Sequence, residues 1–140
     1  MEGRPEVGEL DQAFALLTVD AEGRVDVCLL SRTEVEATPS SLRVVVASTK
    51  ARRNLRATGR ATFLSVTDGA AHYLALRTRH VIEEEGAMAA DLQVERDLRD
   101  DLGVELHPIL FRVEERLAVE ERWDRTRRLL ARLAEEVVPS

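Results

Sequence analysis

The stretch LRVVVASTKARRNLRATG, residues 42–59, decides the fold because it joins a strand signal to a helix signal. Residues 42–47 are rich in β-branched side chains, which favour strands. Ser48 can cap the N-terminus of a helix with its hydroxyl, and Gly59 can end that helix in a left-handed conformation. The stretch therefore predicts a strand, a tight turn and a short basic helix over residues 50–58. Since the strand carries apolar side chains on both faces, we expect both faces to be covered.

Strand signals precede and follow this stretch. Upstream, an apolar run, a turn and an alternating segment predict a hairpin with a half-buried second strand. Downstream, two strand signals meet at Asp68-Gly69, a dipeptide typical of hairpin turns. The predicted strands of the two hairpins are residues 13–19, 24–30, 61–67 and 71–79. We expect a loose arm or a short helical lead-in over residues 1–10 and a loop over residues 32–40.

The C-terminal half predicts two helices around one strand. After a turn at residues 83–86, apolar residues recur at helical spacing over residues 87–102, which predicts an amphipathic helix. Residues 106–119 predict a long strand, and residues 123–137 predict a closing helix. Because hairpins dominate, we expect a mainly β, α+β fold: a six-stranded, largely antiparallel small barrel with flanking helices, in a single domain over residues 1–140.

Length and composition set the broad class of protein. The 140 residues suit one domain, and 44% hydrophobic with 33% charged residues are typical of a globular chain. A net charge of −6 and only 4% aromatic residues argue against nucleic acid as a partner. No uncharged run approaches the ~20 residues that cross a bilayer, and the lone Cys28 has no internal disulfide partner. We therefore expect a cytoplasmic protein without a nucleic-acid or membrane partner.

Most catalytic and metal-binding patterns are missing from the sequence. The histidines, His72, His80 and His107, have no ligand spacing, so we expect no metal site. Gly-x-Ser-x-Gly is absent, and Cys28, in the middle of a predicted strand, is typical of a small buried hydrophobe rather than a nucleophile. No residue stands out as a general acid or base, so the catalytic residues stay unknown.

One constellation combines the groups that bind a phosphate. Ser48, Thr49 and Lys50, the only lysine, follow the strand at residues 42–47, and Arg53 and Asn54 follow them. Hydroxyls and free backbone N–H groups at a helix N-terminus attract anions, and nearby cations add charge-assisted hydrogen bonds. The alternative is a basic surface helix capped by Ser48, and the residues alone favour neither interpretation.

Four stretches stand in a characteristic order: FALLTVDAEGRVDV (14–27), LRVVVAS (42–48), STKARRNL (48–55) and GRATFLSV (59–66). This ordered set resembles the FMN-binding split β-barrel family, which includes pyridoxamine 5′-phosphate oxidase and flavin reductase-like and deazaflavin-dependent proteins. The resemblance covers residues 14–76, and the later elements fit in order without a sharp motif. It implies a six-stranded antiparallel split β-barrel with flanking helices.

The resemblance also implies a flavin site and a homodimer. In that family the flavin lies in a cleft between two subunits, with the second strand of the first hairpin along its ring system. The turn after the third strand holds the phosphate. Carried over to this chain, the ring would lie along Cys28, Leu29, Leu30 and Ser31. The phosphate would meet Ser48, Thr49 and Lys50, with Arg53 or Asn54 in support.

Two positions depart from the oxidase pattern, which has cations where this chain has Ser31 and Thr49. The oxidase's C-terminal substrate-binding segment, with arginine and histidine, is replaced by RRLLARLAEEVVPS, which has no histidine and argues against that oxidase activity itself. We therefore expect an FMN-binding homodimer, an oxidoreductase acting on an unknown small-molecule substrate. The alternatives are a binding or structural module that has lost productive flavin binding, and a deazaflavin-dependent relative.

Overall fold

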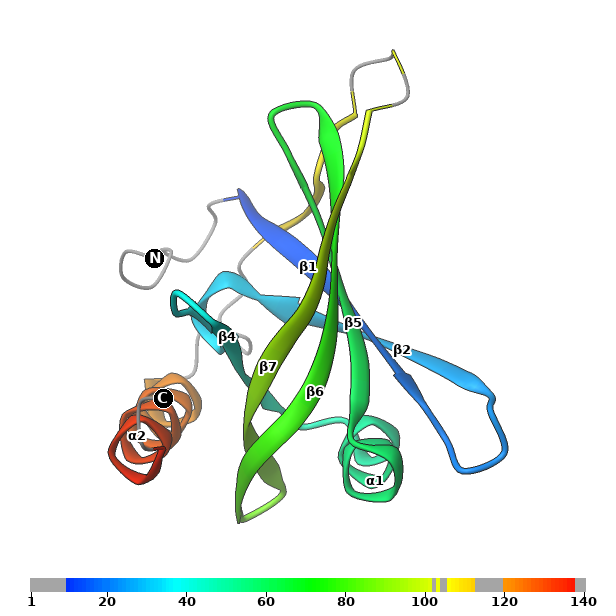
Figure 1. Ribbon diagram of the computed structural model, residues 1–140. Coiled ribbons are helices and arrows are strands. Elements are labelled where there is room, and N and C mark those ends of the chain that lie inside the picture. Colours follow the sequence, from blue (N-terminus) through cyan, green and yellow to red (C-terminus); the bar gives the residue numbers. More distant parts are fainter. Residues whose placement is uncertain (1–9, 102, 104–105, 113–119, 138–140) are drawn as a thin grey trace.

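The chain folds into one curled antiparallel sheet with two α-helices, and the expected α+β class is confirmed. The computed structural model describes residues 10–101, 103, 106–112 and 120–137 (Figure 1). The elements before the first α-helix are β1 (Leu10–Val19), β2 (Val25–Ser31), the 3-10 helix η1 (Arg32–Glu34), β3 (Val35–Ala37) and β4 (Ser41–Val46). They are followed by α1 (Thr49–Thr58), β5 (Arg60–Thr67), β6 (Ala70–Glu84), β7 (Ala87–Asp100), β8 (Ile109–Arg112) and α2 (Glu120–Glu136).

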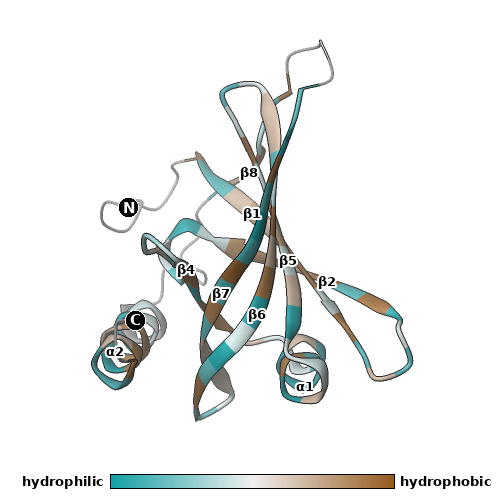
Figure 2. Cartoon of the chain, viewed as in Figure 1, coloured by the Kyte–Doolittle hydropathy of each residue, from teal (hydrophilic) through white to brown (hydrophobic). Residues whose placement is uncertain are grey.

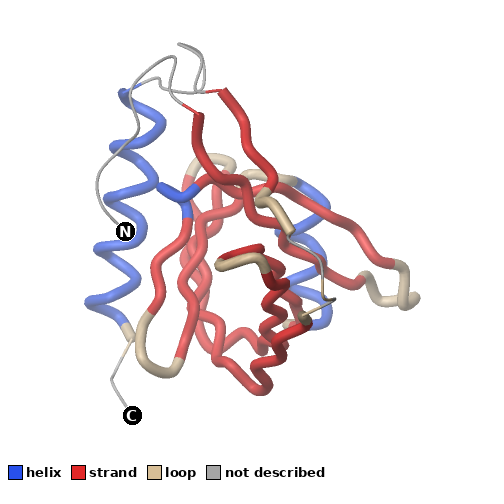
Figure 3. Tube along the Cα trace, turned by 90° about the horizontal axis from the view of Figure 1, so that it is seen from above, coloured by secondary structure: helices blue, strands red, loops and turns tan. Residues whose placement is uncertain are grey.

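The sheet has eight strands rather than the six expected, in the order β2-β1-β5-β6-β7-β4-β3, with β8 paired to the start of β1. The two additional strands are β3, within the predicted loop, and β7, in place of the predicted helix. Seen from above, the strands curl round the inner face of the sheet (Figure 3). In the described part of the chain the end strands β2 and β3 do not pair with each other, so the sheet stays open between them.

The prediction of a helix over residues 87–102 is wrong, because Ala87–Asp100 forms strand β7 between β6 and β4. Met88 and Leu92 face the core inside the sheet, while Ala89 faces the core under α2. A strand buried on both faces is apolar at nearly every position, so helical spacing can be found in it. The burial of Ala87–Leu92 on both faces therefore explains the apolar start of the segment, whereas the rest of β7 is mostly exposed.

The turn chemistry around α1 and between β5 and β6 is confirmed. Ser48 caps α1 by accepting a hydrogen bond from the Ala51 N–H at 3.2 Å. Gly59 ends the helix with a φ of 69°. Asp68 and Gly69 both have positive φ, 52° and 75°, as a tight hairpin turn requires. These features depend on residues close together in the sequence.

Three other boundaries differ from the sequence expectation. Strand β6 continues to Glu84, so the predicted turn at residues 83–86 is shorter. The predicted loop at residues 32–40 contains η1 and β3. Strand β8 occupies only Ile109–Arg112 of the predicted strand at residues 106–119. The rest of that prediction falls partly on residues 113–119, which lie outside the described residues. So do residues 1–9 of the segment predicted over residues 1–10, whereas Leu10 begins β1.

Two hydrophobic cores lie on the two faces of β4. Leu42 and Val44 belong to the first core, inside the curl of the sheet, where Leu55 of α1 also packs. Val45 belongs to the second core, where Leu129 of α2 covers the outer face of the sheet. Figure 1 shows α1 at one end of the sheet and α2 beside β4 and β7. Both faces of this strand are covered as expected, and the second cover is a helix of the same chain.

Strand β2 carries an exposed apolar face. Val25, Val27 and Leu29 alternate along it and are 57%, 61% and 60% exposed. In Figure 2, brown hydrophobic bands alternate with teal ones along β2. Asp26 and Cys28, on the opposite face, are half-buried. The polar face of this edge strand therefore turns toward the protein, and a row of large apolar side chains is left uncovered.

A buried ionic cluster fixes the start of β4 against β6 and β7. The Asp91 carboxylate is fully buried and accepts hydrogen bonds from Arg79 Nε at 2.6 Å and Arg43 Nε at 3.1 Å. Ser41 Oγ also donates to it at 3.0 Å. Burial raises the pKa of Asp91, but these donors outweigh it, so the pKa lies below its ordinary value. The cluster anchors the strand that leads into Ser48 and α1.

Candidate functional site

A cavity of about 490 Å³ joins the end of β2 to the turn before α1. This volume falls within the roughly 300–1,000 Å³ of small-molecule sites, and the walls are mainly apolar. Five of the residues expected at a cofactor site line it: Cys28, Leu29, Leu30, Ser31 and Ser48. The structure therefore brings together two segments that the sequence places about twenty residues apart and that the family resemblance assigns to one ligand.

The backbone of β2 offers hydrogen-bonding groups at this cavity. In the described part of the chain β2 pairs only with β1, so its other edge carries N–H and C=O groups without a ladder partner. A flat polar ring system laid along such an edge can pair with these groups as another strand would. The edge is therefore suited to a heterocycle.

Cys28 faces this cavity as a neutral thiol. Burial raises its pKa to about 11, and the nearby Glu34 carboxylate adds to the shift. Because only the thiolate is a strong nucleophile, this thiol is unreactive at neutral pH. The structure thus agrees with the expectation that Cys28 is a small hydrophobe rather than a nucleophile.

Ser31 is engaged by Glu34 rather than open to a ligand's oxyanion. The Ser31 backbone N–H donates to Glu34 Oε1 at 2.8 Å, and its hydroxyl donates to the same oxygen at 2.9 Å. Thr33 Oγ1 lies 2.8 Å from the Ser31 hydroxyl oxygen. These bonds fix the turn into η1 and place a carboxylate in the cavity wall. The position where the oxidase pattern has a cation therefore lies beside an anion here.

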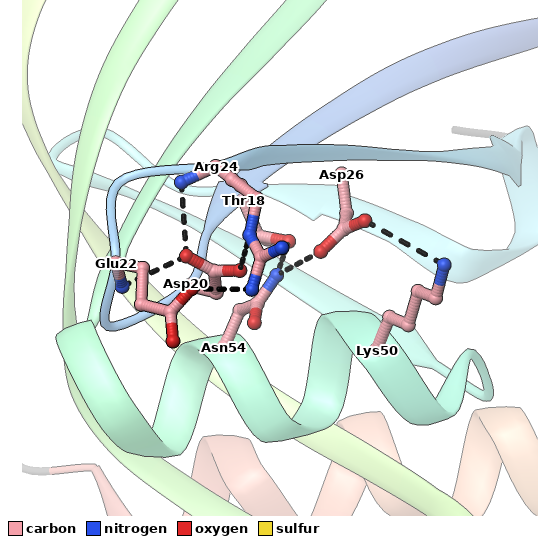
Figure 4. Close-up of polar contacts among 7 residues, drawn as sticks. All are labelled: Thr18, Asp20, Glu22, Arg24, Asp26, Lys50 and Asn54. Atoms are coloured by element: carbon pink, nitrogen blue, oxygen red, sulfur yellow. Dashed lines mark hydrogen bonds and ion pairs between the residues drawn. The ribbon is translucent and has the colours of Figure 1, made fainter.

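Lys50 and Asn54 point toward Asp26 of β2 (Figure 4), and neither lines the cavity. Lys50 Nζ lies 3.9 Å from Asp26 Oδ1, with the lysine side chain 69% exposed. Asn54 is fully buried, and its Nδ2 donates to Asp26 Oδ2 at 2.8 Å and to Thr18 Oγ1 at 3.0 Å. Asp26 therefore ties both side chains of α1 to the first hairpin, and neither lines the cavity.

Two further predicted residues lie on the exposed side of α1. Thr49 is exposed and accepts a hydrogen bond from Arg52 Nη2 at 3.4 Å. Arg53 is exposed as well, and neither Thr49 nor Arg53 lines the cavity. The backbone N–H groups of the first turn before Ala51 have no acceptor within the helix, as at every helix N-terminus. Ser48 is thus the predicted phosphate residue that the structure places in the cavity wall.

Helix α2 supplies cavity residues that the sequence analysis did not find. Trp123, Arg125 and Thr126 form part of the wall, together with residues of β8. Arg125 Nη1 donates to the Glu85 carbonyl oxygen at 3.0 Å, whereas the Arg125 Nε is buried without a hydrogen-bond partner. The sequence shows α2 only as a helix with an apolar stripe and many arginines. Nothing in it predicts that Arg125 is the arginine that lines the cavity.

Two kinds of feature are not found within the ranges that the structure describes. No group of three or more His, Cys, Asp or Glu side chains there could hold a metal ion. No helix there is long and apolar enough to cross a membrane.

The fold is that of FMN-binding and flavin reductase split-barrel proteins. An FMN-binding protein from Syntrophomonas wolfei matches with a TM-score of 0.54 and 16% identity, over 64% of this chain and 77% of that one. The styrene monooxygenase flavin reductase from Pseudomonas putida S12 matches with a TM-score of 0.55 and 12% identity, over 73% and 86%. HutZ, a haem storage protein from Vibrio cholerae, matches with a TM-score of 0.50 and 14% identity, over 73% and 86%.

These similarities establish the fold and leave the ligand to be argued from the site. All three identities are low, and the named proteins handle different ligands, so one fold carries different functions. No protein-family model matches the sequence, and no curated protein matches it. The geometry of the cavity is therefore the basis for a functional conclusion.

Proposed function

We propose that this chain is a flavin-binding protein, with FMN as the cofactor and an oxidoreductase activity on a small molecule. The observation that carries the proposal is that one cavity joins the N-terminus of α1 to the edge of β2 that is unpaired among the described residues. The flavin ring would lie along Cys28–Ser31, and the phosphate would lie near Ser48 at the first turn of α1. The phosphate would receive further polar or positively charged groups from Thr49, Lys50 and Arg53, outside the cavity. Asn54 would hold α1 against the first hairpin.

The residues present fit such a cofactor. Mainly apolar walls suit the ring, and the unpaired edge of β2 suits its polar rim. The flavin would supply the hydride or electron transfer, and the protein would bind it, orient it and exclude water. Cys28 remains protonated, and Glu34 accepts bonds from Ser31, so we assign neither as a general acid or base.

We propose further that the protein is a cytoplasmic homodimer. Val25, Val27 and Leu29 form an exposed apolar row on β2, and Ile109 and Leu110 beside the cavity are each 52% exposed. A second copy placed against these residues would cover them and close the cavity from outside. Light scattering should give twice the 15.7 kDa of one chain, and a monomer at micromolar concentration would contradict the proposal.

The function is tested by titrating the purified protein with FMN, riboflavin and haemin in parallel. We expect tight binding of FMN, weaker binding of riboflavin because it lacks the phosphate, and the visible spectrum of an oxidised flavin in the bound protein. Failure of both flavins to bind a folded protein would overturn the proposal, and tight haemin binding in their place would assign the cavity to another ligand.

One observation favours the alternative of a module without productive flavin binding. Lys50, the only lysine, is paired with Asp26, and Ser31, where the oxidase pattern has a cation, is bonded to Glu34. One residue expected at the phosphate and one expected along the ring therefore each lie beside a carboxylate. A deazaflavin is the other alternative, because its phosphate could use the same turn. Titration with a reduced and an oxidised deazaflavin distinguishes this case from FMN.

A further inference from the structure

Arg125 of α2 contributes a guanidinium group to the wall of the cavity. It lines the same cavity as Ser48, although the two residues lie on elements far apart in the sequence. The Arg125 Nη1 donates to the Glu85 carbonyl oxygen in the β6–β7 turn at 3.0 Å, which fixes the side chain from one side. The group is thus held in place by the protein before any ligand binds.

Within the part of the chain that the structure describes, nothing pairs with the other side of this guanidinium. The Arg125 Nε is buried and makes no hydrogen bond. A buried N–H of a charged group is costly to leave unpaired, so it needs an explanation, and a bound anion or water is one. Since Glu85 takes an Nη1 hydrogen, the Nε and Nη2 hydrogens remain as the parallel pair that arginine offers to two oxygens of one oxyanion.

Arg125 carries the positive charge that could bind an anion in this cavity. Among the described residues that line the cavity, Arg125 is the only cation and Glu34 the only anion. Lys50, the cation expected at the phosphate, lies outside the lining and next to Asp26. Glu34 accepts two hydrogen bonds from Ser31 at the η1 end of the wall.

We propose that Arg125 is the residue that binds the anionic group of the ligand, a phosphate ester, between α2 and the first turn of α1. The inference rests on the proposed function and makes it more specific: the cation at the phosphate comes from the C-terminal helix instead of from Lys50. Because Arg125 and Ser48 line the same cavity, an anion held by the Arg125 guanidinium and by the first-turn N–H groups of α1 would link α2 to the sheet.

The test compares Arg125→Ala and Arg125→Lys with Arg128→Ala. Arg128 lies on the same helix, is 58% exposed, pairs with Glu84 and does not line the cavity, so it controls for the loss of one positive charge. Arg125→Ala should weaken FMN binding by about 10- to 150-fold and leave riboflavin binding within about twofold. Arg125→Lys should retain part of the FMN affinity, and Arg128→Ala should change neither ligand. The assignment is overturned if Arg125→Ala weakens FMN binding and riboflavin binding equally, or if it does not weaken FMN binding.

A second probe separates this inference from the proposed function. Inorganic pyrophosphate should raise the thermal unfolding midpoint of the wild type and of Arg128→Ala, but not of Arg125→Ala. If flavins do not bind but pyrophosphate stabilises the protein through Arg125, the flavin function fails and the anion site stands. If pyrophosphate stabilises Arg125→Ala as strongly as the wild type, or stabilises neither protein, the anion site is overturned. Melting curves without ligand show whether each variant folds.

Discussion

Replacing Asp91 with alanine should destabilise the protein strongly, because it removes the centre of a buried ionic cluster. The Asp91 carboxylate has no exposed surface and accepts hydrogen bonds from two arginines and a serine on β4 and β6. The substitution leaves both guanidinium groups without that counter-charge. Their side chains are 16% exposed for Arg43 and 26% exposed for Arg79, so water replaces only part of what the carboxylate provides.

The size of the loss follows from this burial. Removing one partner of a buried ion pair costs about 3–5 kcal/mol, and the partial exposure of both arginines places the Asp91→Ala loss near the lower limit, at about 3 kcal/mol. Asp91→Asn keeps an oxygen acceptor and loses the charge, so its loss should be smaller. A loss of about 3 kcal/mol is a large part of the roughly 5–15 kcal/mol that stabilises a typical domain.

The pH dependence gives the same prediction a second readout. The pKa of Asp91 is lowered in the folded protein, so its stabilising effect is complete above the unfolded pKa of about 3.9 and is lost as the pH falls through the folded pKa. The difference in unfolding free energy between the wild type and Asp91→Asn should therefore be constant at neutral pH. It should shrink only in strong acid.

Urea denaturation followed by circular dichroism measures these losses, with Glu95→Ala as the matched control. Glu95 also lies on β7 and pairs with an arginine of β6, Arg77, at 3.2 Å, but their side chains are 40% and 53% exposed. Such a surface pair contributes about 0–1 kcal/mol. Equal losses for Asp91→Ala and Glu95→Ala would refute the reasoning, because burial would then not determine the cost.

The segment from β4 through α1 could be predicted from the sequence, because the residues that determine its structure lie close together in the chain. The cap at Ser48 and the left-handed end at Gly59 each depend on residues within one helical turn. The positive φ angles at Asp68 and Gly69 likewise follow from a dipeptide. The family resemblance adds the link between β2 and this turn, which local signals cannot provide.

The walls of the cavity depend on contacts between distant segments. Residues of β8 and α2 lie far along the chain from β2, and nothing in the sequence distinguishes Arg125 from its neighbours Arg127 and Arg128. The ion pair between Lys50 and Asp26 forms because the polar face of β2 turns toward α1. An alternating pattern predicts which residues share a face of a strand. It does not predict which of the two faces packs against the rest of the protein.

The ion pair between Lys50 and Asp26 limits what this lysine can add to ligand binding, so Lys50→Ala should weaken FMN binding by no more than about fivefold. Asp26→Asn should strengthen it, and calorimetric titration with riboflavin as the control measures both. Cys28 should react with iodoacetamide slowly at neutral pH and faster only as the pH approaches its pKa of about 11; rapid alkylation at neutral pH would contradict a buried neutral thiol. Val27→Asp should convert the proposed homodimer into monomers in light scattering, whereas Leu98→Asp, at an equally apolar and 49% exposed position on β7, should not. The reason is that two copies of the β2 face would each bury an unpaired carboxylate in the interface, which costs far more than a carboxylate in water. If both variants dissociate the dimer equally, or neither does, the β2 face is not the interface.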